Sequence, residues 1–235
     1  MALPILNDTI KHEAEIPSSK KKITYRPYLV KEEKVLLQAF ESNDEKTAMR
    51  AMVDTVIACV NEHINPNMLT TYDVEFLFAR IRAKSVGETT EINAKCSVED
   101  CGAETAITID ISTAEVTAKK EISNIINLTD DISMELKHPS YTAFLKNFKE
   151  GISETEYGMT MVEECILSVN TPDERITEWT RDEVKAFIDS MTSKQFANVG
   201  EYLENSPRLT KEIDWNCIKC DHKNKLTLEG LSDFF

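Results

Sequence analysis

Glycine and histidine are scarce in this chain of 235 residues, which contains six glycines and four histidines. So few glycines argue against a phosphate-binding loop, and none of the sequences GxxxxGK[ST], GxGxxG, HExxH or GxSxG is present. The histidines, His12, His63, His138 and His222, are scattered along the chain. Acidic residues are so numerous that their pairing identifies no acid–base couple. We therefore expect a protein that is not an enzyme.

Basic residues are also few: the chain contains 27 Lys and Arg against 41 Asp and Glu, which gives a net charge of −14. Such a charge repels nucleic acid and anionic lipid, and it favours a basic protein surface as partner. No apolar run approaches the roughly 20 residues that span a bilayer. The first residues, MALPILNDTI, lack the basic start and long apolar stretch of a signal peptide. We expect no membrane-spanning segment and a cytoplasmic location in the cell that makes the chain.

Four of the six cysteines form two close pairs, Cys96-x4-Cys101 and Cys217-x2-Cys220. In each copy an alternating strand lies six residues after the second cysteine, ITID in one and LTLE in the other. An isoleucine also precedes each first cysteine by four residues. Two cysteine turns with matching strands are typical of a zinc ribbon, in which four thiolates hold a structural Zn²⁺. The alternatives are two unrelated reduced pairs, or His222 as a substitute ligand.

The other two cysteines, Cys59 and Cys165, lie within helical patterns, and we expect them to be small buried hydrophobic residues. Helix starts are predicted at Ser153, Thr180 and Thr192, each followed three residues later by Glu or Gln. The helix after Ser153 is predicted to continue through the sequence YGMTMVEECILSV. A strand pair is predicted for IINL and ISMELK, turned by Asp130-Asp131.

The predicted fold class is α+β, mainly helical, with a small antiparallel zinc-ribbon-like β element. Cys96 and Cys217 lie 121 residues apart, so the helical middle is expected to be an insertion between two halves of one ribbon. The expected parts are a flexible N-terminal arm (1–24), a helical part (25–90), a β ribbon with the first cysteine knuckle (91–137), a second helical part (138–207), and the second knuckle with a C-terminal strand completing the ribbon (208–235).

Two longer segments carry more specific patterns: YRPYLVKEEK at 25–34, followed by VLLQAFES, and YDVEFLFARIRAKSVGE at 72–88. In the first, Pro27 forces Arg26 into an extended conformation. Tyr25, Arg26 and Tyr28 then form either a partner-binding edge or a strap packed on their own domain. The second segment is a helix that is apolar around more than half its circumference, so it is expected to be buried or to contact a partner.

These two segments resemble the baseplate hub assembly protein family of T-even-like contractile-tailed bacteriophages, over about residues 23–110. The resemblance implies a protein needed to build the central hub of the tail baseplate. Its partners would be phage baseplate hub proteins, and it would act in the cytoplasm of the infected bacterial host or in the virion tail baseplate. The resemblance specifies no oligomeric state.

Three functions follow from the sequence. The first is a non-enzymatic hub assembly factor that acts by protein binding. The second is a permanent structural component of the baseplate hub in the virion. The third is a zinc-ribbon nucleic-acid adaptor, which the net charge of −14 disfavours.

Overall fold

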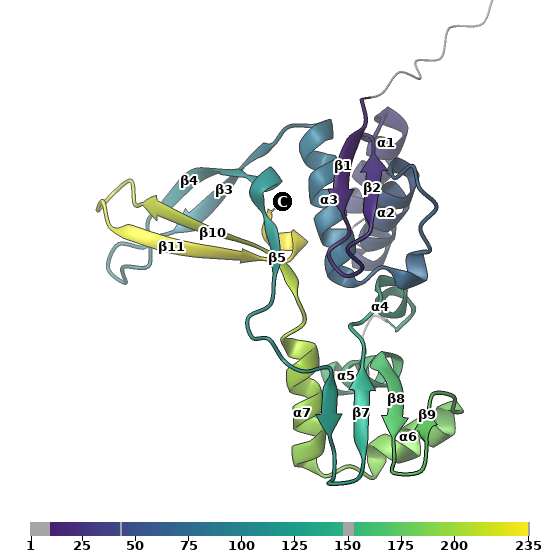
Figure 1. Ribbon diagram of the computed structural model, residues 1–235. Helices are drawn as coiled ribbons and strands as arrows, with labels where there is room; N and C mark the ends of the chain where they lie inside the picture. The colour runs from purple at the N-terminus through teal and green to yellow at the C-terminus, as the bar shows by residue number, and fades with distance from the viewer. Residues whose placement is uncertain (1–9, 43, 148–152, 235) are drawn as a thin grey trace, which may run out of the picture. The chain divides into compact units, whose positions relative to one another are not determined.

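The computed structural model of the chain describes residues 10–42, 44–147 and 153–234 (Figure 1). The chain divides into two compact units. The first unit comprises Met1–Pro66, Tyr72–Thr117 and Arg208–Phe235, and the second comprises Asn67–Thr71 and Ala118–Pro207. The middle of the chain is therefore an insertion within the first unit, as the spacing of the cysteine pairs predicts.

The N-terminal part of the first unit is a β-hairpin with three helices. The hairpin pairs β1 (His12–Glu15) with β2 (Lys22–Tyr25), and α1 (Val30–Glu41), α2 (Glu45–Cys59) and α3 (Thr71–Ser85) follow. The hairpin corrects one prediction, because its strands lie mostly within the segment 1–24 that was expected to be a flexible arm. Its loop is fastened to α3, since the Ser18 amide and hydroxyl donate to the Asp73 carboxylate at 2.9 and 2.6 Å.

Helix α3 is buried on most of its sides, with Val74, Leu77 and Ile81 at most 2% exposed. This burial explains the nearly continuous apolar pattern of the segment 72–88 without a partner protein. The polar side chains of α3 bond to segments outside the helix: Asp73 to Ser18, Glu75 to the Leu209 amide, Arg80 to the Ala114 carbonyl, and Ser85 to the Tyr28 amide.

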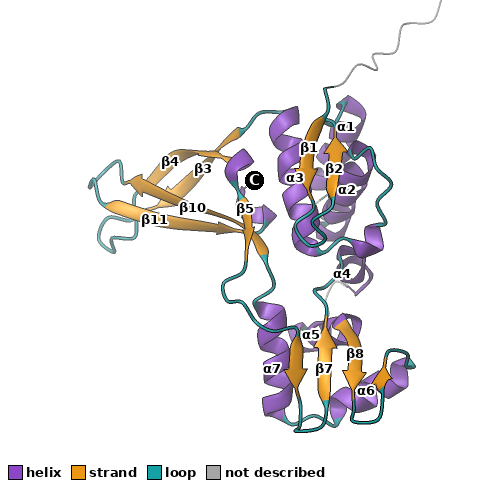
Figure 2. Ribbon diagram, in the orientation of Figure 1, coloured by secondary structure: helices purple, strands orange, loops and turns teal. Residues whose placement is uncertain are grey.

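The remainder of the first unit is the β ribbon (Figure 2). Strands β3 (Thr89–Lys95) and β4 (Glu104–Asp110) form one antiparallel hairpin. A three-stranded antiparallel sheet has the order β11-β10-β5. Its members are β5 (Glu115–Thr117), β10 (Arg208–Asn216) and β11 (Lys223–Glu229), and short 3-10 helices lie at Ile111–Thr113 and Leu231–Phe234.

The second unit is a four-stranded antiparallel sheet with helices on one face. The strand order is β6-β7-β8-β9. The core joins Met134 and Leu136 of the sheet with Val162 of α5, Ile188 of α6 and Val199 of α7. The elements are β6 (Ile125–Asn127), β7 (Ser133–Leu136), α4 (Tyr141–Asn147), α5 (Glu154–Cys165), β8 (Ile166–Asn170), β9 (Arg175–Ile176), α6 (Arg181–Asp189) and α7 (Ser193–Glu204).

The class α+β is confirmed, but "mainly helical" is not, because the described residues contain eleven strands. The strand pair around Asp130-Asp131 is confirmed as β6 and β7, yet it belongs to the second unit and not to the ribbon. Residues 138–207 were expected to be helical and also contain β8 and β9. The helix predicted over YGMTMVEECILSV ends at Cys165, because Ile166–Asn170 pairs with β7 instead.

Three predicted helix starts are confirmed by hydrogen bonds. Ser153 caps α5 by accepting from the Glu156 amide, and Thr180 and Thr192 form capping boxes at α6 and α7. Among the described residues, none of the helices combines the length and the apolar character needed to cross a membrane.

Candidate metal centre

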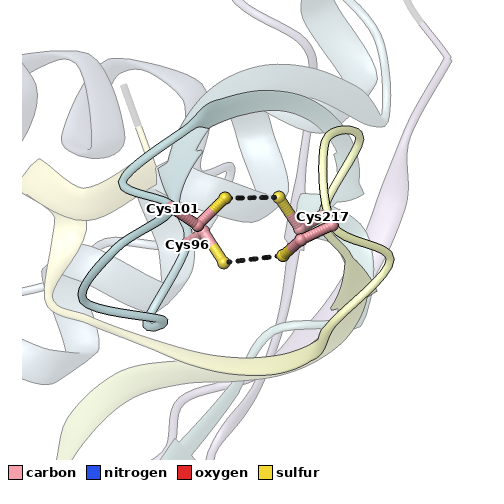
Figure 3. A group of neighbouring side chains, drawn as sticks. Cys96, Cys101 and Cys217 are labelled. Atoms are coloured by element: carbon pink, nitrogen blue, oxygen red, sulfur yellow. Dashed lines mark hydrogen bonds between the residues drawn. The ribbon is translucent and has the colours of Figure 1, made fainter.

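The four cysteines of the two predicted knuckles converge on one point. Their Sγ atoms all lie within 4.8 Å of one another. Figure 3 labels Cys96, Cys101 and Cys217 around this point, and the Sγ atoms of Cys101 and Cys217 are 3.7 Å apart. The Sγ atoms of Cys96 and Cys220 are also 3.7 Å apart. A tetrahedral zinc with Zn–S bonds of about 2.3 Å separates its sulfurs by about 3.8 Å. A disulfide would need about 2.05 Å, so the spacing fits a shared metal ion and not a sulfur–sulfur bond.

Each knuckle closes with the same backbone hydrogen bond. The amide of Cys96 donates to the Ala103 carbonyl at 2.9 Å, and the amide of Cys217 donates to the His222 carbonyl at 2.9 Å. In both cases the acceptor stands two residues after the second cysteine. The repeated cysteine pattern in the sequence therefore encodes a repeated turn.

The residue after each second cysteine has a left-handed backbone. Gly102 has a φ of 51° and Asp221 a φ of 57°. Glycine adopts this conformation at little cost, while aspartate tolerates it better than most side chains do. The two knuckles thus require the same conformation and meet the requirement with different residues.

The two knuckles are also bonded to each other reciprocally. The Ser97 amide donates to Asn224 Oδ1 at 2.9 Å, and the Ile218 amide donates to Thr105 Oγ1 at 3.3 Å. Each donor follows the first cysteine of its knuckle, and each acceptor lies four residues after the second cysteine of the other. Asn224 is 4% exposed and also donates to the His222 carbonyl at 2.9 Å. These contacts make the knuckles pseudo-symmetric partners that fix the position of the cysteines.

The sequence interpretation missed Asn224 and Thr105, although the matched spacing offered a signal for both. Asparagine and threonine are common in strands and turns, so only their equal distance from the cysteines distinguishes them. The apolar surroundings follow the same symmetry. Ala94 and Trp215 stand two residues before the first cysteines, and Ile107 and Leu226 stand six residues after the second. All four pack in one cluster with Cys96, Cys101 and Cys217.

The electrostatics of the metal-free centre favour the thiolate at Cys217 and oppose it at Cys220. Amide N–H groups of Cys220 and Lys219 point at the Cys217 sulfur and lower the pKa of its thiol to about 6. The amide of His222 acts in the same direction on Cys220, but partial desolvation of the sulfur and the three neighbouring thiols raise the pKa of Cys220 to about 12. Thiolate is the form that binds metal, and a dication offsets the repulsion between neighbouring sulfurs. Four thiolate ligands leave no open position for water, so such a centre is structural and not catalytic.

His222 contributes its backbone to the centre. The group of potential ligands found among the described residues contains the four cysteines and no histidine. Cys59 and Cys165 lie elsewhere and are buried as expected, at 1% and 0% exposure. Burial raises the pKa of Cys59 to about 11 and that of Cys165 to about 12, so both remain protonated thiols.

The segment Tyr25–Tyr28 is tied to its own unit. Tyr25 is buried, at 3% exposure. The Arg26 guanidinium donates to Glu32 Oε1 at 2.9 Å and to the Ala58 carbonyl at 3.0 Å, and the Tyr28 amide donates to Ser85. These contacts are those expected of a strap, and the partner-binding edge at Tyr25, Arg26 and Tyr28 stays a prediction. The sequence interpretation named Arg26 but missed its partner Glu32, which lies six residues later in a run of charged residues.

Comparison with known proteins gives one match. The family model described as "T4 bacteriophage base plate protein" matches residues 8–235. No curated protein and no solved structure matches the chain. The match covers both units and the cysteine centre, and the chain therefore belongs to the T4 bacteriophage base plate protein family.

Proposed function

We propose that the chain is an assembly factor for the hub of the phage tail baseplate, and that it acts by binding other baseplate proteins without catalysing a reaction. The observation that carries the proposal is the family match over residues 8–235. The similarity of the segments 25–34 and 72–88 to hub assembly proteins supports the finer assignment to the hub. The net charge of −14 favours basic surfaces of other proteins as partners.

The cysteine centre has a structural role in this proposal and binds one Zn²⁺. Its ligands come from both sides of the inserted second unit, two from the turn between β3 and β4 and two from the turn between β10 and β11. The metal would hold the C-terminal segment of the first unit against the segment that precedes the insertion. The ion would cross-link the two turns and take part in no reaction. Elemental analysis of the purified chain tests this role, with one zinc per chain as the expected result and a folded, metal-free chain as the contradiction.

A permanent structural component of the hub is the second candidate, and the family description as a base plate protein fits it equally well. The two candidates differ in the finished particle, because an assembly factor leaves and a component stays. A zinc-ribbon nucleic-acid adaptor is disfavoured by the acidic charge, and salt-sensitive binding to DNA would revive it.

The proposal is tested by removing the chain from infected cells and by finding its partners. Phage that lack the chain are expected to accumulate no complete hubs, while an affinity-tagged copy supplied in trans restores them. The tagged copy is expected to co-purify with hub proteins from infected cells. Normal hub yield without the chain, or a tagged copy that restores hubs but binds no baseplate protein, would contradict the proposal.

A further inference from the structure

Exposed apolar side chains gather on one short stretch of the first unit. Among the described residues, eleven large hydrophobic side chains are exposed, and five of them lie within residues 29–40. A soluble protein seldom groups such side chains without a partner surface to cover them. The five are Leu29, Val30, Val35, Leu37 and Phe40.

Helical geometry places three of these residues in one stripe on α1. At 3.6 residues per turn, Val30, Leu37 and Phe40 fall within an arc of about 80°. Their exposed fractions are 64%, 55% and 49%. The side chains that α1 buries are Glu32, Leu36 and Ala39, which lie on a different face. Helix α1 thus exposes more large apolar side chains than it buries, and the α1 stripe, defined as Val30, Leu37 and Phe40, is available for contact with another chain.

Two exposed charges of opposite sign flank the α1 stripe. Lys34 is exposed near the N-terminal end, and Glu41 is exposed in the last turn. The first turn also carries Lys31, which pairs with Glu32 at 3.4 Å, and the half-buried Glu33, which lies within the arc of the stripe. Glu41 lies at the negative end of the helix dipole, and no basic residue occupies that turn. A second helix that ran antiparallel would bring its own Lys34 towards Glu41 and its own Glu41 towards Lys34.

We infer that the α1 stripe is a self-association surface, on which α1 of a second copy of this chain packs antiparallel. The arrangement is isologous, since a two-fold axis near the middle of α1 makes each contact occur twice. The pair Lys34 and Glu41 carries the choice of a second copy over another protein, because these exposed side chains are opposite in sign and would meet each other across the two-fold axis. The net charge of −14 opposes the association of two copies, but this repulsion is largely screened beyond about 8 Å at physiological salt.

The size of the surface predicts a weak dimer. A helix of 12 residues is about 18 Å long, so it buries less than the roughly 800 Å² per partner of a standard interface. We therefore expect a concentration-dependent equilibrium and not a permanent dimer.

Sedimentation velocity of the full chain tests the inference, over about 1 µM to about 1 mM, the range in which weak dimers dissociate. The weight-average mass of the unmodified chain is expected to rise from 26.7 kDa towards twice that value. Leu37→Glu should weaken the dimer at least about 30-fold, since two apolar contacts are lost per dimer. Val86→Glu is the matched control, because Val86 is 61% exposed and lies outside α1, and it should leave the dimer unchanged. A constant monomer mass, or equal effects of the two substitutions, would overturn the inference.

Charge reversal tests the antiparallel arrangement separately and preserves the apolar stripe. Lys34→Glu and Glu41→Lys are each expected to weaken the dimer about tenfold, since each puts like charges together at two equivalent places. The double variant Lys34→Glu/Glu41→Lys is expected to return to within about threefold of the unmodified chain. A double variant as weak as the single variants would rule out this pairing of copies.

Discussion

Glu75 of α3 forms hydrogen bonds to the C-terminal segment of the chain, although burial disfavours its charged form. Its carboxylate accepts the Leu209 amide at 3.2 Å, and the Leu231 amide bonds to it as well. Burial nevertheless raises the pKa of Glu75 above its ordinary value of 4.5, because desolvation outweighs these hydrogen bonds. A carboxyl whose pKa is raised by folding contributes stability below its unfolded pKa and loses that contribution as the pH rises through the folded value.

Glu75→Gln is therefore expected to leave the free energy of unfolding at neutral pH unchanged within about 1 kcal/mol, because the amide oxygen still accepts the two N–H groups. Ionisation of Glu75 should lower the free energy of unfolding as the pH rises above 4.5, and the glutamine variant should lack this part of the decrease. Glu75→Leu removes the acceptor and should cost about 1–3 kcal/mol for each amide left unpaired. Urea unfolding at several pH values measures both variants. A glutamine variant as unstable as the leucine variant would show that the charge itself is needed.

The knuckles are the elements in which local sequence decides the structure most directly. Gly102 and Asp221 share a left-handed backbone, so substitution there should have opposite effects. Gly102→Ala is expected to destabilise the chain by about 1 kcal/mol, because an added Cβ disfavours φ near 51°. The space itself is free, since the nearest atom to that Cβ is Lys95 Cε at 3.8 Å.

Asp221→Gly should instead stabilise the chain by a few tenths of a kcal/mol or leave its stability unchanged, because the left-handed strain disappears while the unfolded chain gains freedom. Thermal unfolding in the presence of added zinc measures both substitutions. If Gly102→Ala proved neutral and Asp221→Gly strongly destabilising, the knuckles would not be conformationally equivalent.

Two serine substitutions with different expected effects test the cysteine centre. Cys217→Ser removes one of four ligands and should lower bound zinc below one per chain and destabilise the first unit by at least about 3 kcal/mol. Cys59→Ser buries a hydroxyl in place of a thiol and should cost about 1–2 kcal/mol with zinc content unchanged. Metal analysis and urea unfolding distinguish the two variants. Equal zinc content in both would argue against a shared site.

Elements whose structure is decided by neighbouring residues could be predicted from the sequence, and elements decided by distant residues could not. The cysteine spacing, the helix caps at Ser153, Thr180 and Thr192, and the turn at Asp130-Asp131 act within a few residues, and all appear as expected. The sheet to which a strand belongs is decided by distant residues. The pair β6–β7 therefore could not be assigned to the second unit from its own pattern, and Ile166–Asn170, an apolar stretch directly after a helix, could not be recognised as its partner.

At the scale of the whole molecule, the insertion explains why two similar cysteine turns stand 121 residues apart. The first unit is built from both ends of the chain, so contacts between its N-terminal and C-terminal segments join residues that are far apart in the sequence. Glu75 with Leu209, Asn224 with Ser97, and the cysteine centre each join the C-terminal segment to the part that precedes the insertion. The contacts of Arg26 with Glu32 and Ala58 could not be predicted from the sequence, because folding brings these residues together.

We propose that this member of the T4 bacteriophage base plate protein family assists hub assembly and then leaves. Counting the copies of the chain in purified mature tails and in hub intermediates from the same infected cells, by quantitative mass spectrometry, tests it most directly. We predict that the chain is present in the intermediates together with hub proteins and falls at least about tenfold, relative to those proteins, in finished tails. A constant whole number of copies per mature tail would contradict the claim and identify the chain as a permanent component of the baseplate.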